Sequence, residues 1–168
     1  YENEKFVWTD NYVSEGNHAA LAPSTEEIVT TCLSKDGKPL RWVRKNDIYK
    51  YGKFTGTSTL ETALYNMAVD EMINNFEKDG TLRTGLYWGG VWTRDVSYSS
   101  LLSLAYMCPD KVKNSLEVKI DRMGRIIQDT GTGGSWPCSS DRVVWALSAW
   151  NIYLATGDIE WLQKAYPV

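Results

Sequence analysis

The stretch WGGVWTRD, residues 88–95, gathers two tryptophans, two glycines, an arginine and an aspartate. Indole rings present flat apolar faces, and an adjacent arginine and aspartate supply a fork of N–H donors beside two acceptor oxygens. A sugar ring has both a C–H face and hydroxyl groups. A site that pairs those hydroxyls gains selectivity, because a ligand without them leaves polar groups unpaired. These residue types at this spacing favour saccharide binding.

Arg94 and Asp95 also have a purely structural interpretation. Asp95 stands where an N-cap or first-turn acid of a helix belongs, because a carboxylate there accepts hydrogen bonds from unpaired backbone N–H groups. The two side chains can also pair with each other. On the residues alone, ligand contact and this structural role are alternatives of equal weight.

A second loop, GGSWPCSSDR at residues 133–142, repeats the Gly-Gly-x-Trp pattern. Trp136 follows Trp92 by 136 − 92 = 44 positions, which is typical of a helical-hairpin repeat. Alternate connections in antiparallel helix pairs lie at the same end, so both loops are expected on one face. For Asp141 and Arg142, capping and helix-surface pairing are favoured over ligand contact. The expected substrate-binding residues are Tyr87, Trp88, Trp92, Arg94, Asp95, Trp136, Asp141 and Arg142.

Helices are expected to position these loops. From Leu60 onward apolar residues recur at helical spacing, and Ser58 with Glu61 forms a capping box at the start of the pattern. Proline at 109, glycine at 157 and aspartate at 158 supply further start and stop signals. The expected helices cover residues 59–78, a segment ending at 108, a segment from 109 to the glycine-rich DTGTGG, about 139–157, and a last one from 158.

Residues 1–56 differ in character, because they carry prolines and glycines and no sustained helical period. We expect short strands and loops there. Residues 57–168 are expected to form the first helical hairpins of a larger arrangement. The predicted fold class is therefore mainly α, with a short β or irregular N-terminal segment.

Composition limits the function classes. Of the 168 residues, 43% are hydrophobic and 23% are charged, which is typical of a globular protein. A net charge of −3 and the lack of a basic run argue against nucleic acid as a partner. The sequence contains no uninterrupted stretch of about 18 apolar residues, so it predicts no membrane span. The 8 Trp and 10 Tyr against 3 Phe favour surfaces that stay partly wet, which suits a sugar ligand.

The cysteine and histidine content argues against several other chemistries. Three cysteines, without C-x-x-C spacing, do not predict a zinc site or a disulfide scaffold. A single histidine, His18, leaves little material for a histidine-based triad or metal site. We therefore assign no metal and no cofactor. The chain begins at Tyr1 without methionine, which suggests a processed or expressed segment.

The segment YWGGVWTRDVSYSSLL resembles the part of glucoamylases and related six-hairpin, (α/α)6-barrel glycosidases in which a W-T-R-D motif opens an early helix. Residues 133–162 are similar to a loop–helix–turn–helix unit of bacterial members. The resemblance covers about residues 57–168. It implies that Arg94 and Asp95 bind the sugar on the non-reducing side of the cleaved bond, with Trp92 lining that subsite. Where glucoamylases carry a tyrosine this chain has Trp88, with Tyr87 next to it.

The resemblance also implies a partial (α/α)6 toroid, since such a barrel needs twelve helices and this sequence predicts four and the start of a fifth. Inverting glycosidases use two carboxyls roughly 6.5 to 9.5 Å apart. In these families the general acid and base usually sit on loops between later helices. We therefore expect a glycoside hydrolase-type, carbohydrate-active protein, an N-terminal fragment that lacks the general acid and is inactive alone. Its catalytic residues are unknown.

Two expectations concern partners and location. The ligand is expected to be an oligosaccharide or polysaccharide, and unpaired helix faces of a partial barrel would favour self-association. Polysaccharide-degrading barrels are often exported, so a periplasmic or extracellular location is expected. The alternative from a different class is a non-catalytic carbohydrate-binding module or helical interaction module.

Overall fold

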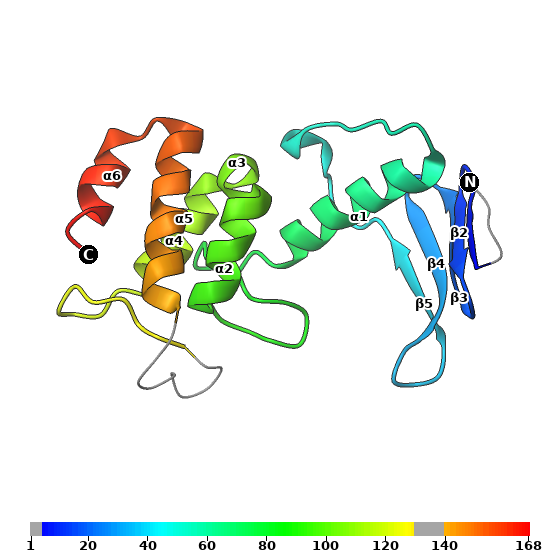
Figure 1. Cartoon of the computed structure of the whole chain (residues 1–168), viewed down its shortest axis with the longest axis horizontal. Helices are drawn as coiled ribbons and strands as arrows, with labels where there is room; N and C mark the ends of the chain where they lie inside the picture. The colour runs from blue at the N-terminus through cyan, green and yellow to red at the C-terminus, as the bar shows by residue number, and fades with distance from the viewer. Residues whose placement is uncertain (1–4, 130–139) are drawn as a thin grey trace. The chain divides into compact units, whose positions relative to one another are not determined.

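The computed structural model describes residues 5–129 and 140–168 (Figure 1). The chain divides into two compact units, Tyr1–Asn74 and Asn75–Val168. The first unit combines a sheet with one long helix, and the second is built from helices and loops. Each unit has its own hydrophobic core.

The sheet of the first unit is an antiparallel meander in which the strands follow chain order. Each strand pairs only with its sequence neighbours, so short turns suffice to connect them. Gly16 and Gly37 adopt positive φ between successive strands, where other residues would be strained. The strands are β1 (Phe6–Trp8), β2 (Tyr12–Glu15), β3 (His18–Ser24), β4 (Glu27–Leu33) and β5 (Pro39–Val43).

A short 3-10 turn, η1 (Tyr49–Tyr51), precedes the helix α1 (Thr59–Asn74), which packs against β3 and β4. The predicted capping box is confirmed. The backbone N–H of Glu61 donates to Ser58 Oγ at 3.1 Å, and that of Ser58 donates to Glu61 Oε2 at 3.2 Å. These bonds satisfy N–H groups that a helix start leaves unpaired.

The core of the first unit lies between the helix and the sheet. Its fully buried members are small or aliphatic, which lets the helix approach the strands closely. They are Ala22, Ile28, Leu60 and Ala63, with Trp8, Val13, Ala20, Trp42 and Met67 packed around them.

Asp70 of α1 is a buried acid that ties the helix to the segment after β5. Only 1% of the residue is exposed. Its carboxylate accepts hydrogen bonds from Trp42 Nε1 at 3.0 Å, from the backbone N–H and Nδ2 of Asn46, both at 2.8 Å, and from the Lys45 N–H at 3.2 Å. Burial alone would raise the pKa of Asp70. The hydrogen bonds from Asn46, Trp42 and Lys45 outweigh that effect and hold it below its ordinary value.

The second unit has a core around two buried tryptophans. Trp145 Nε1 donates to the Leu116 carbonyl at 3.0 Å and Trp161 Nε1 to the Ala149 carbonyl at 2.9 Å, so both indoles are satisfied inside the core. The helices of this unit are α2 (Thr93–Ser99), a π-helical turn η2 (Ser100–Leu104), α3 (Ala105–Met107), α4 (Pro109–Glu117), α5 (Asp141–Thr156) and α6 (Ile159–Ala165).

Local end signals in this unit are confirmed. Pro109 lies in the first turn of α4, and Gly157 closes α5 in the left-handed conformation with φ of 68°. Asp158 caps α6 by accepting the Trp161 N–H at 2.9 Å. The helix ends predicted from these three residue types therefore occur in the structure.

Two matching hairpins follow α1 and α4. In the first, the Glu77 N–H donates to the Thr81 carbonyl at 2.9 Å, and in the second the Asp121 N–H donates to the Arg125 carbonyl at 2.8 Å. The offset is 121 − 77 = 44 positions, the same as between the two Gly-Gly-x-Trp loops. Gly80 lies in the first turn with φ of 87° and its counterpart 44 positions later has φ of 75°.

The second hairpin corrects one expected helix. Residues 109 to 128 were expected to be helical, but α4 ends at Glu117 and a bridge pairs Ile120 with Ile126. These isoleucines fit a helical period as well as the two arms of a hairpin. The expected helix over 59–78 ends at Asn74 for the same reason, since a bridge pairs Phe76 with Leu82.

The expected fold class is wrong. The structure contains 21% strand and 43% helix, so this is a mixed α/β protein and not a mainly α set of toroid hairpins. The N-terminal segment was expected to contain short strands and loops, with no sheet specified. The strands pair as one continuous sheet that covers a face of α1, and the helix predicted to start the hairpin array belongs to the sheet unit. In the described parts of the chain, no helix is both long and apolar enough to cross a membrane.

Candidate functional site

An ordered loop leads into α2 and presents aromatic side chains to solvent. Backbone hydrogen bonds join Gly85 and Trp88 in both directions, at 3.2 and 3.1 Å. Arg83 Nε donates to the Gly85 carbonyl at 3.1 Å, and this bond also holds the loop. Tyr87 is 74% exposed and Trp88 is 60% exposed. The loop therefore holds two large rings in water by backbone contacts and not by burial.

Trp88 and Trp92 form an aromatic corner. Their ring centroids lie 5.6 Å apart and the ring planes meet at 74°, an edge-to-face arrangement that aromatic pairs favour. Trp92 is half-buried and directly precedes α2, whereas Trp88 lies further out on the loop. The corner thus has one anchored ring and one ring open to a ligand.

Arg94 does not pair with Asp95. Its Nε lies 3.1 Å from Asp141 Oδ1, and Asp141 at the start of α5 is completely buried. The backbone N–H of Asp129 donates to Asp141 Oδ2. Asp95 is exposed in the first turn of α2, as its structural interpretation proposed. The ion pair between Arg94 and Asp141 joins the start of α2 to the start of α5.

A second ion pair lies beside the first. Lys119 Nζ is 2.7 Å from Asp129 Oδ1 and donates to the Val91 carbonyl at 3.0 Å. Asp129 Oδ2 accepts the Thr93 N–H and hydroxyl, each at 2.8 Å. Lys119 and Asp129 therefore fix the backbone on both sides of Trp92.

The arrangement favours binding over proton transfer. Asp129 accepts hydrogen bonds from three donors on Thr93 and Lys119, and Asp141 holds Arg94 and a backbone N–H. A general acid or base must exchange a proton with its ligand, and both carboxylates are instead committed to the framework. In the described ranges, no three His, Cys, Asp or Glu side chains are placed to hold a metal ion.

Of the expected site residues, the structure brings several together. Tyr87, Trp88 and Trp92 share the loop, and Arg94 meets Asp141. Arg142 points outward at the start of α5 with high exposure, and Trp136 lies outside the described residues. Lys119 was missed, because a lone lysine after an amphipathic helix is ordinarily a surface charge.

We predict that Lys119→Met destabilises the second unit by about 2 kcal/mol, because Asp129 and the Val91 carbonyl lose a cationic donor whose side chain is only 12% exposed. Lys164→Met is the matched control. Lys164 pairs with Glu117 at 2.6 Å on the exposed surface, so its loss is expected to cost about 0.5 kcal/mol or less. Urea unfolding of both variants measures the difference. Equal effects would show that Lys119 is not part of the framework.

The fold and site together describe a mixed α/β protein whose helical unit carries a fixed aromatic loop beside two ion pairs. Comparison of the chain with protein-family models, curated proteins and solved structures finds no significant match.

Proposed function

We propose that this protein is a carbohydrate-active protein that binds saccharides on the loop from residue 84 to residue 92. The observation that carries this proposal is Trp88, 60% exposed on a loop held by its own backbone bonds and packed edge-on against Trp92. A large apolar ring fixed in water favours a partner that covers its face. The C–H face of a sugar ring is such a partner.

Polar groups that suit sugar hydroxyls follow the aromatic corner within one helical turn. The Arg94 side chain is 40% exposed although its Nε faces Asp141. A guanidinium carries five N–H donors, so this one side chain can hold the framework and still donate to a ligand. Asp95 adds exposed acceptor oxygens in the same turn. Donors, acceptors and an apolar face are the combination that a saccharide requires.

The parent activity that the sequence resemblance implies, glycoside hydrolysis, is also part of the proposal. The described residues support sugar binding and not the proton transfers of hydrolysis, because Asp129 and Asp141 are held by framework contacts. We therefore propose that this chain carries part of a sugar subsite and does not hydrolyse glycosides by itself. Assays with chromogenic glycosides test that statement, and turnover by the purified chain would contradict it.

Calorimetric titration with gluco- and manno-oligosaccharides tests the binding proposal. Trp88→Ala is expected to weaken binding by about tenfold or more, because stacking on an aromatic face contributes roughly 1.5 kcal/mol. Trp150→Ala is the control, since Trp150 is also half-exposed but lies on α5 and pairs with Tyr153. Binding that survives Trp88→Ala unchanged would contradict the proposal.

One observation favours a second candidate, a helical interaction module. Four apolar side chains at helical spacing stand exposed along α5, namely Val143, Leu147, Trp150 and Leu154. Such a stripe is typical of a face that packs on another helix. The same variants separate the two candidates, because a helix partner would be lost in Trp150→Ala and retained in Trp88→Ala.

A further inference from the structure

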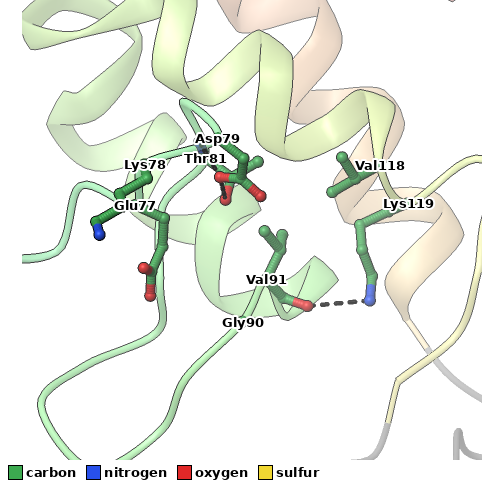
Figure 2. A pocket seen from close by; sticks show the side chains of 8 residues that line it. All are labelled: Glu77, Lys78, Asp79, Thr81, Gly90, Val91, Val118 and Lys119. Atoms are coloured by element: carbon green, nitrogen blue, oxygen red, sulfur yellow. Dashed lines mark hydrogen bonds between the residues drawn. The ribbon is translucent and has the colours of Figure 1, made fainter.

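We infer that a cleft beside the aromatic loop is a second saccharide subsite, so that the ligand is a neutral oligosaccharide and not a single sugar. The inference rests on the proposed function of the loop and adds a second subsite for a ligand longer than one sugar ring. The cleft has a volume of about 530 Å³ (Figure 2). Pockets that hold small ligands commonly measure about 300 to 1,000 Å³. Its walls include Glu77, Asp79, Thr81, Val91, Val118 and Lys119.

Three segments of the second unit build the cleft. The first hairpin contributes Glu77, Lys78 and Asp79. The backbone just before α2 contributes Val91, and the two residues that follow α4 are Val118 and Lys119. Figure 2 shows the valine side chains between the hairpin and the end of α4, with the Lys119 amine turned back to the Val91 carbonyl. All three segments are fixed by backbone or side-chain hydrogen bonds.

The chemistry of the walls selects a neutral polar ligand. The cleft is lined by two carboxylates, those of Glu77 and Asp79, and by two amines, those of Lys78 and Lys119, so its net charge favours neither an anion nor a cation. Hydrogen bonds from the Thr81 hydroxyl and N–H keep the pKa of Asp79 below its ordinary value, so this group is an ionised acceptor. Sugar hydroxyls both donate and accept, and they match walls that carry both kinds of charge.

The two valines add the apolar component. Val118 is half-exposed at the end of α4, and Val91 lies between the cleft and the helical core. A sugar ring presents C–H groups that can cover such side chains and gain free energy from the buried apolar area. A ligand composed only of charged or strongly hydrated groups would gain nothing from them.

The cleft is continuous with the aromatic loop through one backbone segment. Val91 lines the cleft and the next residue, Trp92, forms the aromatic corner with Trp88. Lys119 lines the cleft and also pairs with Asp129, which holds Thr93 on the far side of Trp92. A saccharide that stacks on Trp88 and is longer than one ring can therefore continue into the cleft.

Affinity as a function of chain length tests this inference. Calorimetric titrations use gluco-oligosaccharides of one to six residues in the α-1,4 and β-1,4 series. We expect the affinity of the unmodified protein to rise by about tenfold or more from one residue to four, because added hydrogen bonds and apolar contacts contribute in the cleft. Val118→Trp fills the cleft and is expected to abolish that rise while monosaccharide binding remains. Val143→Trp, the same change at an exposed valine of α5, is expected to keep it.

The outcomes separate the inference from the function on which it rests. A rise with chain length that persists in Val118→Trp overturns the cleft subsite and leaves the loop function standing. Absence of binding to every saccharide overturns both. If circular dichroism shows that Val118→Trp does not fold, Glu77→Gln takes its place, since it changes one wall carboxylate to an amide of equal size. Glu77 Oε1 also lies 3.7 Å from Nε of Arg83, which holds the aromatic loop, so monosaccharide affinity is measured in the same variant and is expected to stay unchanged. The length-dependent rise is then expected to fall at least about threefold, and an unchanged rise overturns the subsite.

Discussion

Replacing Asp70 with alanine is expected to destabilise the first unit by about 3 kcal/mol or more. The carboxylate accepts four hydrogen bonds from Trp42, Lys45 and Asn46, and the substitution leaves these donors without their acceptor in the interior. Each buried donor that loses its partner costs roughly 1 to 3 kcal/mol, although rearrangement recovers part of the sum. Urea unfolding followed by the Trp42 indole N–H resonance reports this unit directly.

Asp70 also gives this unit a defined response to acid. Its pKa lies below the ordinary value in the folded protein, so its contribution to stability is fully present above the unfolded-state pKa of about 4. That contribution is lost as the pH falls through the lower folded-state pKa. Asp70→Asn is expected to reduce this acid-dependent loss, whereas Asp36→Asn, in the exposed turn before β5, is expected to keep it. Equal acid sensitivity in both variants would contradict the assignment.

Arg94→Met is expected to destabilise the second unit by about 3 to 5 kcal/mol, more than Asp141→Asn at the other end of the same ion pair. The reason is the difference in burial between the partners. Asp141 is completely buried and the Arg94 side chain is 40% exposed. Removing the arginine takes a cation away from a buried carboxylate, which is costly. Removing the charge of the aspartate leaves an arginine that can turn toward water.

For Asp141→Asn we therefore expect a loss of about 1 to 2 kcal/mol. The asparagine oxygen can still accept the Asp129 N–H that Asp141 Oδ2 accepts. Urea unfolding followed by the indole N–H resonance of the buried Trp145 measures both variants in the second unit. A larger loss for Asp141→Asn than for Arg94→Met would reverse the argument from burial.

Local signals in the sequence predicted helix ends well. Ser58 with Glu61, Gly157, and Asp158 each act within a few residues, through one hydrogen bond or one backbone conformation. Such signals need no knowledge of the rest of the fold. The hairpin around Gly124 was not predicted, because Ile120 and Ile126 fit a helical period equally well.

Contacts between residues far apart in the sequence were predicted less well than helix ends. Asp36-Gly37 is a typical hairpin turn signal, but a local signal of this kind pairs two strands and does not show that five short strands join into one sheet and hold α1. In the site, the loop tryptophans could be read from their motif, whereas the partner of Arg94 is Asp141, 141 − 94 = 47 positions away. Asp95, the neighbour in sequence, is a reasonable partner for Arg94 until the helices are placed. The fold decided between them.

The most direct test of the central claim is to follow all eight tryptophan indole N–H resonances by NMR while a gluco-oligosaccharide is added. If the loop binds saccharides, the resonances of Trp88 and Trp92 shift with increasing ligand. Those of the buried Trp145 and Trp161 stay in place. Shifts confined to Trp150 on α5, or no shift at any tryptophan, would contradict the proposal that this loop is the saccharide site.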